Sequence, residues 1–214
     1  MVVPVEYSDF HRALLQALIN HGTIKHTVFE AIFKKLNAKF HPEQLQIDVV
    51  IEMINEKISP FDQKITKYEY GLTDEVFYVF HSTTVTAASK LQATFTEDEI
   101  DYFKNILLKI TENENLTITP LNALNLSDEL PGKINKTRAE KLLEMWIQCH
   151  YFLKHNNQIH LGAKLLSEFK ELLQSFELDY LKSCLLCESV AVWFLSRSKN
   201  CPSCKEKWEV LADN

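Results

Sequence analysis

Four cysteines near the C-terminus constrain the fold of this chain more than any other feature. They form two Cys-x-x-Cys pairs, Cys184/Cys187 and Cys201/Cys204, which are separated by 13 residues. Each pair can present two thiolates from one tight turn, and two such turns complete the tetrahedron that zinc prefers. The spacer is slightly shorter than in the common four-cysteine pattern, but it is long enough to fold back. The spacing predicts that these four cysteines bind one zinc ion.

Two other interpretations of the cysteines fit the sequence less well. A redox-active pair of the thioredoxin type lies near a β-α-β pattern, and neither pair has that setting. A catalytic zinc site keeps one position open and usually includes His or carboxylate ligands, whereas no histidine follows His160. Four thiolates would close the zinc shell. We therefore expect a structural zinc ion, and we assign no catalytic residue.

The composition favours a folded, helix-rich protein without a membrane segment. Of the 214 residues, 46% are hydrophobic and 24% are charged, a balance that excludes disordered and collagen-like chains. Only 4 glycines and 6 prolines are present, which disfavours long loops and β architectures with many turns. The first residues do not resemble a signal peptide, and the apolar run 190–195 is far shorter than the roughly 20 residues that cross a bilayer. The sequence predicts an intracellular protein.

Residues 1–90 carry the pattern of a winged-helix domain, which consists of three helices followed by a β-hairpin. Apolar residues recur at helical spacing in three segments, residues 8–20, 25–39 and 42–58. The period then changes to two in residues 65–70, a turn is predicted at residues 71–74, and residues 76–80 are rich in aromatic and β-branched residues, as a second strand would be. This order predicts a first winged-helix domain.

Residues 91–180 nearly repeat this order, although no sequence repeat is visible. Thr96-Glu97-Asp98-Glu99 is a capping box that opens a helix. Further patterns predict a short helix, a long helix, a short strand and a final amphipathic helix, at residues 119–124, 137–154, 158–161 and 165–173. We interpret this order as a second winged-helix domain with a reduced wing. Residues 181–214 are too few for a core of their own and need the zinc ion to hold them together.

Several short motifs, in their order and spacing, resemble the non-SMC element one family, the RING-like subunit of the SMC five/six (structural maintenance of chromosomes) complex. The motifs are the opening stretch from His11-Arg12 through His21-Gly22, the helix 96–110, Asn122–Leu126, Leu161-Gly162 and the ending Cys-Pro-x-Cys-x3-Trp at Trp208. The resemblance implies a RING-like C-terminal module, which in this family holds two zinc ions with eight ligands. Cys184/Cys187 correspond to the first ligand pair and Cys201/Cys204 to the last, so the four middle ligands are missing.

The predicted fold is therefore mainly α with small β hairpins, an α+β chain. It consists of tandem winged-helix domains at residues 1–90 and 91–180, followed by a degenerate RING-like zinc knuckle with one ion at residues 181–214.

The resemblance also implies a function. It implies a nuclear, chromosome-associated subunit of the SMC five/six complex that binds a MAGE-like subunit and a kleisin subunit and serves DNA recombination and repair. It further implies a RING-type ubiquitin ligase, which holds a charged ubiquitin-conjugating enzyme in a reactive pose and so catalyses by positioning. The residues that match the family's docking roles are Leu186, Trp193 or Phe194, Pro202 and Lys205. The alternative is a purely architectural subunit, in which these residues only pack the zinc knuckle.

The net charge of -6 argues against a chain that binds nucleic acid over its whole surface. The third helix of the first domain is acidic, with Lys57 opposed by Glu43, Asp48, Glu52 and Glu56. Carboxylates repel phosphate, so we expect this helix to contact protein rather than DNA.

The third helix of the second domain begins with four cations, Lys133, Lys136, Arg138 and Lys141. Only Glu140 opposes them. Such a run is commonly a solvated helix end. A weak, auxiliary DNA contact at these four cations is a third hypothesis.

Cys149 is followed directly by His150, a combination that suggests a nucleophile and its base. Adjacent residues on a helix point about 100° apart, so these two side chains cannot easily share a hydrogen bond. We therefore expect Cys149 to be a small buried apolar residue. The remaining histidines show no metal-binding spacing, and no Gly-rich phosphate loop is present.

Overall fold

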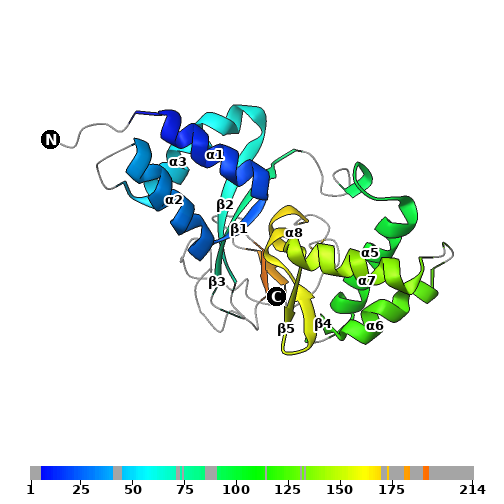
Figure 1. The fold of residues 1–214 in the computed structure, drawn as a ribbon. Helices are drawn as coiled ribbons and strands as arrows, with labels where there is room; N and C mark the ends of the chain where they lie inside the picture. The colour runs from blue at the N-terminus through cyan, green and yellow to red at the C-terminus, as the bar shows by residue number, and fades with distance from the viewer. Residues whose placement is uncertain are drawn as a thin grey trace, which may run out of the picture. The chain divides into compact units, whose positions relative to one another are not determined.

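The computed structural model describes most of the first 169 residues and short parts of the rest. The described residues are 6–40, 45–70, 73, 75–84, 91–113, 115–130, 132, 134–169, 173, 181–183 and 190–192. The chain divides into two compact units, Met1–Thr84 and Val85–Asn214. Both units combine helices with a small antiparallel sheet (Figure 1), so the prediction of helices with small β hairpins is confirmed at that level.

The described residues of the first unit form three helices, a short 3-10 turn and a three-stranded sheet. In chain order its elements are α1 (Asp9–His21), β1 (Thr23–Lys25), α2 (His26–Phe40), α3 (Ile47–Ile58), η1 (Ser59–Phe61), β2 (Gln63–Tyr70) and β3 (Glu75–Ser82). The strand order is β1-β3-β2, and both pairings are antiparallel. The predicted helices and hairpin are present, and β1 is an additional strand.

Local sequence signals explain where α1 begins and ends. The backbone N–H of Ser8 donates to Nδ1 of His11 at 3.1 Å, in a capping box at the first turn. Gly22 follows the helix with a φ of 66°, a left-handed conformation that favours glycine. Its N–H donates to the carbonyl of Leu18 at 2.8 Å and closes the last turn.

The third helix begins later than the sequence predicts. Its first residue is Ile47, and Gln46 precedes it as an extended N-cap residue with φ of -87° and ψ of 134°. Pro42, where we expected the helix to start, lies outside the described residues. The apolar spacing from Ile47 to Ile58 was therefore a better guide to this helix than the proline.

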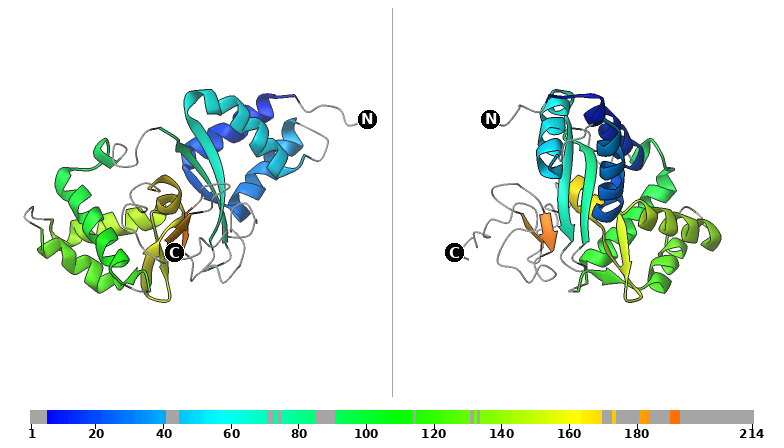
Figure 2. Two further views of the ribbon diagram at one scale, coloured as in Figure 1. Left: turned by 180° about the vertical axis from the view of Figure 1, so that it is seen from behind. Right: turned by 60° about the vertical axis from the view of Figure 1, so that its left-hand side comes forward.

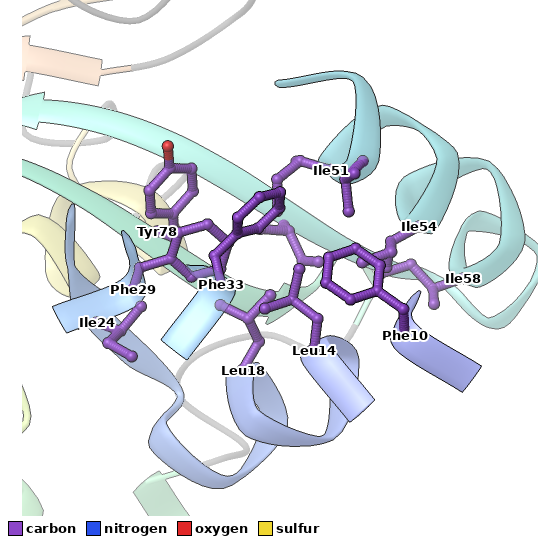
Figure 3. Close-up of a cluster of buried hydrophobic side chains, with 12 residues drawn as sticks. Phe10, Leu14, Leu18, Ile24, Phe29, Phe33, Ile51, Ile54, Ile58 and Tyr78 are labelled. Carbon is purple, nitrogen blue, oxygen red and sulfur yellow. The ribbon is translucent and has the colours of Figure 1, made fainter. Parts of the chain in front are cut away.

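The core of the first unit lies between the three helices and one face of the sheet (Figure 3). Its buried side chains are Phe10, Leu14, Leu18, Ile24, Phe29, Phe33, Val50, Ile51, Ile54, Ile58, Ile65 and Tyr78. The helical members recur at the three- and four-residue intervals from which the helices were predicted. Aromatic rings fill the centre, and those of Phe10 and Phe33 meet edge to face with centroids 5.3 Å apart.

The second unit repeats the order of the first with shorter strands. Its elements are α5 (Glu97–Thr111), β4 (Thr117–Ile118), α6 (Pro120–Asn125), η2 (Leu126–Asp128), α7 (Lys136–Gln148), β5 (Phe152–His155), β6 (Gln158–Leu161) and α8 (Ala163–Glu168). The strand order is β4-β6-β5, again antiparallel. A separate two-stranded sheet follows, β7 (Leu181–Ser183) and β8 (Val190–Val192).

Trp146 of α7 is the centre of the second core. It is fully buried, and its ring contacts those of Tyr102, Phe103 and Phe152 at centroid distances of 5.6, 5.1 and 6.2 Å. One buried side chain thus joins α5, α7 and β5. The capping box predicted at Thr96 is present, with Oγ1 accepting from the N–H of Glu99 at 3.4 Å.

The prediction of one helix over residues 137–154 is wrong at its C-terminal end. The helix ends at Gln148, His150 has a φ of 62°, and residues 152–155 form β5. The hairpin turns at Asn156 and Asn157, which have φ values of 48° and 57°. Two asparagines in this conformation are typical of a tight hairpin turn, so the local turn chemistry outweighs the helical spacing.

None of the helices in the described ranges has the length and apolar content that a membrane span requires.

Candidate functional site

The predicted zinc and enzyme-docking residues lie outside the part of the chain that the structure describes. They are Cys184, Cys187, Cys201 and Cys204 for zinc, and Leu186, Trp193 or Phe194, Pro202 and Lys205 for docking. The backbone on either side of the first cysteine pair is described, because Ser183 of β7 pairs antiparallel with Val190 of β8. The first Cys-x-x-Cys pair therefore falls within the connection between two paired strands.

Lys136, the first residue of α7, is held by groups of its own unit. Its Nζ lies 2.6 Å from a carboxylate oxygen of Asp128 and donates to the carbonyl of Leu124 at 2.9 Å. The same ammonium lies 3.5 Å from Oδ1 of Asn125. Lys136 therefore connects α7 to the end of α6 and to η2, and its charge is balanced by a carboxylate.

Arg138 is paired with the carboxylate of the capping box. Its Nε and Nη2 lie 2.7 and 2.6 Å from Oε1 of Glu99, whose side chain is only 10% exposed. The other carboxylate oxygen of Glu99 accepts from the N–H of Thr96 at 3.1 Å. Because one buried carboxylate serves both the first turn of α5 and the guanidinium of α7, Arg138 has a structural role.

Two of the four cations predicted to contact DNA are thus engaged by acids. Lys141 is exposed and makes no ion pair within the described residues, and Lys133 lies outside them. Local pairing reduces the positive charge that phosphate would meet. The DNA contact stays a prediction, and Lys141 is the residue on which it can be tested without disturbing an ion pair of the described structure.

The outward face of α3 is acidic. Asp48 pairs with Lys67 of β2, their charged atoms 2.9 Å apart, while Glu52 and Glu56 are exposed and form no ion pair within the described residues. Glu43 lies outside the described residues. This charge disfavours phosphate and suits a protein partner with cationic groups.

Seven large apolar side chains are exposed in the described residues, and we consider three of them as anchors for a partner. In the first unit, Val49 of α3 is 43% exposed next to the acidic face, and Phe61 of η1 is 72% exposed. In the second unit, Leu121 near the start of α6 is 67% exposed. Single exposed apolar residues are common on protein surfaces, so of the three only Val49 has a specific chemical setting, beside the acidic face of α3.

Cys149 is exposed, so the prediction that it is buried is wrong. It is the C-cap residue of α7, and its N–H donates to the carbonyl of Met145 at 2.8 Å. Because the helix ends here, Cys149 lies beyond the buried stripe that the longer predicted helix would have continued.

The β5–β6 hairpin brings His160 close to His155, a pair that the spacing of the histidines did not predict. Their ring centroids are 6.4 Å apart. Burial lowers the pKa of His160, and the charge of His155 lowers it further. Across the described residues no group of three or more His, Cys, Asp or Glu side chains is placed to hold a metal ion. His155 is opposite Gln158 in the hairpin, and alternation along β6 puts His160 on the same face as Gln158. The two histidines therefore lie on one face of the sheet.

Comparison with known proteins gives a consistent result. A family model described as the Nse1 non-SMC component of the SMC5-6 complex matches residues 11–176. This match covers both three-stranded sheets and ends before Cys184.

The similar proteins share most of their length with this chain. The non-structural maintenance of chromosomes element 1 homolog of Drosophila melanogaster is 27% identical over 92% of this chain and 94% of its own length. The Homo sapiens protein of the same name is 26% identical, over 94% and 84%. Among solved structures, a chain of an Nse1-Nse3-Nse4 complex has a TM-score of 0.73 at 21% identity, covering 96% of this chain and 99% of that one. At that identity, the structural likeness establishes the fold alone.

Proposed function

This chain belongs to the Nse1 family of non-SMC components of the SMC5-6 complex, and we propose that it works there by binding a MAGE-like subunit and a kleisin subunit. The observation that carries the proposal is the family match over residues 11–176, which spans the helices and sheets of both units. The similar fold of a chain from an Nse1-Nse3-Nse4 complex supports it. A chromosome-associated role in DNA recombination and repair in the nucleus follows from this proposal.

Both units, within residues 1–90 and 91–180, are proposed to be winged-helix domains. Two features support this assignment. Each unit runs helix, strand, helix, helix, strand, strand, and in each sheet the third strand lies between the other two. The β2–β3 and β5–β6 hairpins would be the wings.

In the first unit the partner contact is assigned to the outward face of α3, where Val49 lies beside Glu52 and Glu56. An exposed apolar side chain flanked by free carboxylates suits a partner surface that is apolar with a basic rim. Reversing both charges, with Glu52→Lys and Glu56→Lys, should weaken binding of the MAGE-like or the kleisin subunit at least 10-fold. The control is the double variant Glu140→Lys and Glu144→Lys, which reverses two exposed glutamates of α7 at the same spacing. Equal affinity of the two variants would assign the contact elsewhere.

For the C-terminal module we propose one structural zinc ion bound by Cys184, Cys187, Cys201 and Cys204. Four thiolates make a closed donor set that suits zinc. The pairing of β7 with β8 supports this arrangement, since it reverses the chain around the first cysteine pair. The zinc would stabilise the module and supply no chemistry.

Ubiquitin transfer is proposed to occur by positioning alone. Leu186, Trp193 or Phe194, and Pro202 would form an apolar surface for the charged conjugating enzyme, and Lys205 would bond both proteins. An architectural subunit without ligase activity is the second candidate, because the sequence has only four of the eight ligands of a RING. A loss of positioning of about 1 Å can lower such a rate about 10²-fold.

The two candidates are separated by timing ubiquitin discharge from a panel of charged conjugating enzymes, with the chain bound to its MAGE-like partner. Discharge that Cys201→Ser and Leu186→Ala abolish, while Leu186→Ala leaves the zinc content and the melting temperature unchanged, would establish the ligase. Absence of discharge from a sample with one zinc ion per chain would establish the architectural role.

An auxiliary DNA contact is tested with Lys141→Ala rather than with Arg138, whose removal disturbs Glu99. Binding to duplex DNA should fall with salt, and the variant should lower the salt dependence by about one ion. If Lys141→Ala binds DNA as the wild type does at every salt concentration, this cation makes no contact.

A further inference from the structure

The backbone of Ile65 points to the open edge of the first sheet. With the order β1-β3-β2, strand β2 pairs with β3 alone among the strands of the described residues. In β3, Phe80 is opposite Ile65, and its N–H donates to the carbonyl of Gly22 on the β1 side at 2.8 Å. Opposed residues of an antiparallel pair either exchange both hydrogen bonds or point both groups away from each other. The N–H and C=O of Ile65 therefore point away from β3.

The side-chain amide of Asn55 in α3 forms hydrogen bonds with both of these backbone groups. Its Oδ1 accepts from the N–H of Ile65 at 2.7 Å, and its Nδ2 donates to the C=O of Ile65 at 2.9 Å. A side-chain amide offers the same donor and acceptor as a peptide group. Asn55 therefore takes the place that one residue of a further strand would take.

A second contact keeps α3 along this edge. By the same alternation, Lys67 is the next residue of β2 whose backbone faces outward. Its side chain pairs with Asp48 of α3, their charged atoms 2.9 Å apart. Ile54 and Ile58, on either side of Asn55 along α3, are buried in the core and fix the position of the helix. In Figure 2, α3 runs next to the long hairpin.

We propose that Asn55 closes the edge of β2 to strand addition by another chain. An eight-residue edge strand is long enough to serve as a template for such pairing, and natural proteins cover or block edges of this kind. A partner of this unit then binds its side-chain surfaces and does not extend its sheet at Ile65. The proposal is independent of which partner the unit binds.

Three variants of the 214-residue chain test the role of the amide. Asn55→Ala removes both hydrogen bonds, and Asn55→Asp keeps an acceptor for the N–H of Ile65 but no donor for its C=O. The matched control is Asn20→Ala, which removes an exposed helical asparagine whose Oδ1 accepts from Gln16 at 3.0 Å. Hydrogen exchange of the Ile65 amide, and sedimentation velocity over a range of protein concentrations, are the two measurements.

In Asn55→Ala the Ile65 amide should exchange about 10-fold faster or more, and the chain should associate as its concentration rises. Asn55→Asp should keep the slow exchange, and Asn20→Ala should match the wild type in both measurements. Equal exchange of Ile65 in wild type and Asn55→Ala would overturn the proposal. So would a monomer at every concentration despite fast exchange at Ile65, or equal acceleration at Val50 and Ile54, which would indicate general loosening of α3.

Discussion

The two units share a strand order but differ in the length and protection of their longer edge strands. In the first sheet, β2 is an eight-residue edge strand tied to α3 by Asn55 and by the Asp48–Lys67 pair. In the second sheet, the longer of the two edge strands, β5, has four residues. A short edge offers few backbone groups to another chain, whereas a long one requires protection. The same topology thus places different demands on the side chains around it.

The third helices of the two units also differ. On α3 the carboxylates of Glu52 and Glu56 point outward. On α7 the cations Lys136 and Arg138 form ion pairs within their own unit. The charge of α3 is therefore accessible to a partner, whereas much of the charge of α7 holds helices of its own unit together. Topology alone does not decide which face of such a unit binds.

The largest predicted effect concerns a glycine of the second unit. A Cβ at Gly162 would collide with the backbone carbonyl oxygen of His150 and lie 2.8 Å from that of Tyr151. Gly162→Ala should therefore lower the free energy of unfolding by about 3 kcal/mol, measured by urea denaturation.

The matched control for that glycine is Gly132→Ala. There the atoms nearest to the new Cβ belong to the side chain of Asp98, which can rotate away. A change of at most about 0.5 kcal/mol is expected. Equal losses in the two variants would contradict the assigned role of the close approach at Gly162.

Removing the guanidinium of Arg138 should have the next largest effect. Arg138→Ala leaves the nearly buried carboxylate of Glu99 without its cation, and we expect a loss of about 2 kcal/mol in the free energy of unfolding. Lys141→Ala, on the same helix and exposed, should lose at most about 0.5 kcal/mol. Urea denaturation curves measure both. If Arg138→Ala left the free energy of unfolding unchanged, the ion pair of α7 would have no structural role and the contrast in charge use between α3 and α7 would be lost.

The stability of the second unit should depend on pH through His160. Burial lowers the pKa of His160 in the folded state below its ordinary value of 6.5. As the pH falls below 6.5, the unfolded chain takes up this proton first, so the stabilising contribution of neutral His160 is present above pH 6.5 and is lost below it. One proton corresponds to at most about 1.4 kcal/mol per pH unit.

Urea denaturation at several pH values between 5 and 7.5 measures this slope. His160→Gln, which cannot titrate, should reduce the slope of the unfolding free energy against pH. An unchanged slope would contradict the assignment of this dependence to His160.

The smallest predicted effect is at the surface ion pair of the first unit. Lys67 and Asp48 are both largely exposed, so water and salt screen their attraction. Lys67→Ala should change the free energy of unfolding by less than about 1 kcal/mol. A loss as large as that of Arg138→Ala would show that the edge of β2 depends on this pair more than on Asn55.

Much of the fold was predictable from short-range patterns. The apolar spacing in α1, α2 and α3, the capping box at Thr96, the alternation in β2 and the aromatic and β-branched residues of β3 report local preferences that the tertiary structure keeps. The strands β1 and β4 were not predictable, because three- and two-residue strands leave no periodicity and exist only through pairing with distant residues.

The roles of individual polar residues were less predictable than the elements that carry them. The cations of α7 formed a visible charge run, but the carboxylates that pair with them, Glu99 and Asp128, are distant in sequence or on another element. Asn55 gave no signal, because its role depends on the backbone of Ile65 in the adjacent strand. The zinc and docking residues stay predictions.

The central claim is that this Nse1-family chain is an assembly subunit that binds the MAGE-like and kleisin subunits. Native mass spectrometry of the three co-expressed chains tests it most directly. We predict a complex with one copy of each chain, formed by the wild type and also by Cys201→Ser, because the family match ends at residue 176, before the cysteines. A folded wild-type chain that is recovered alone, without either partner, would contradict the account.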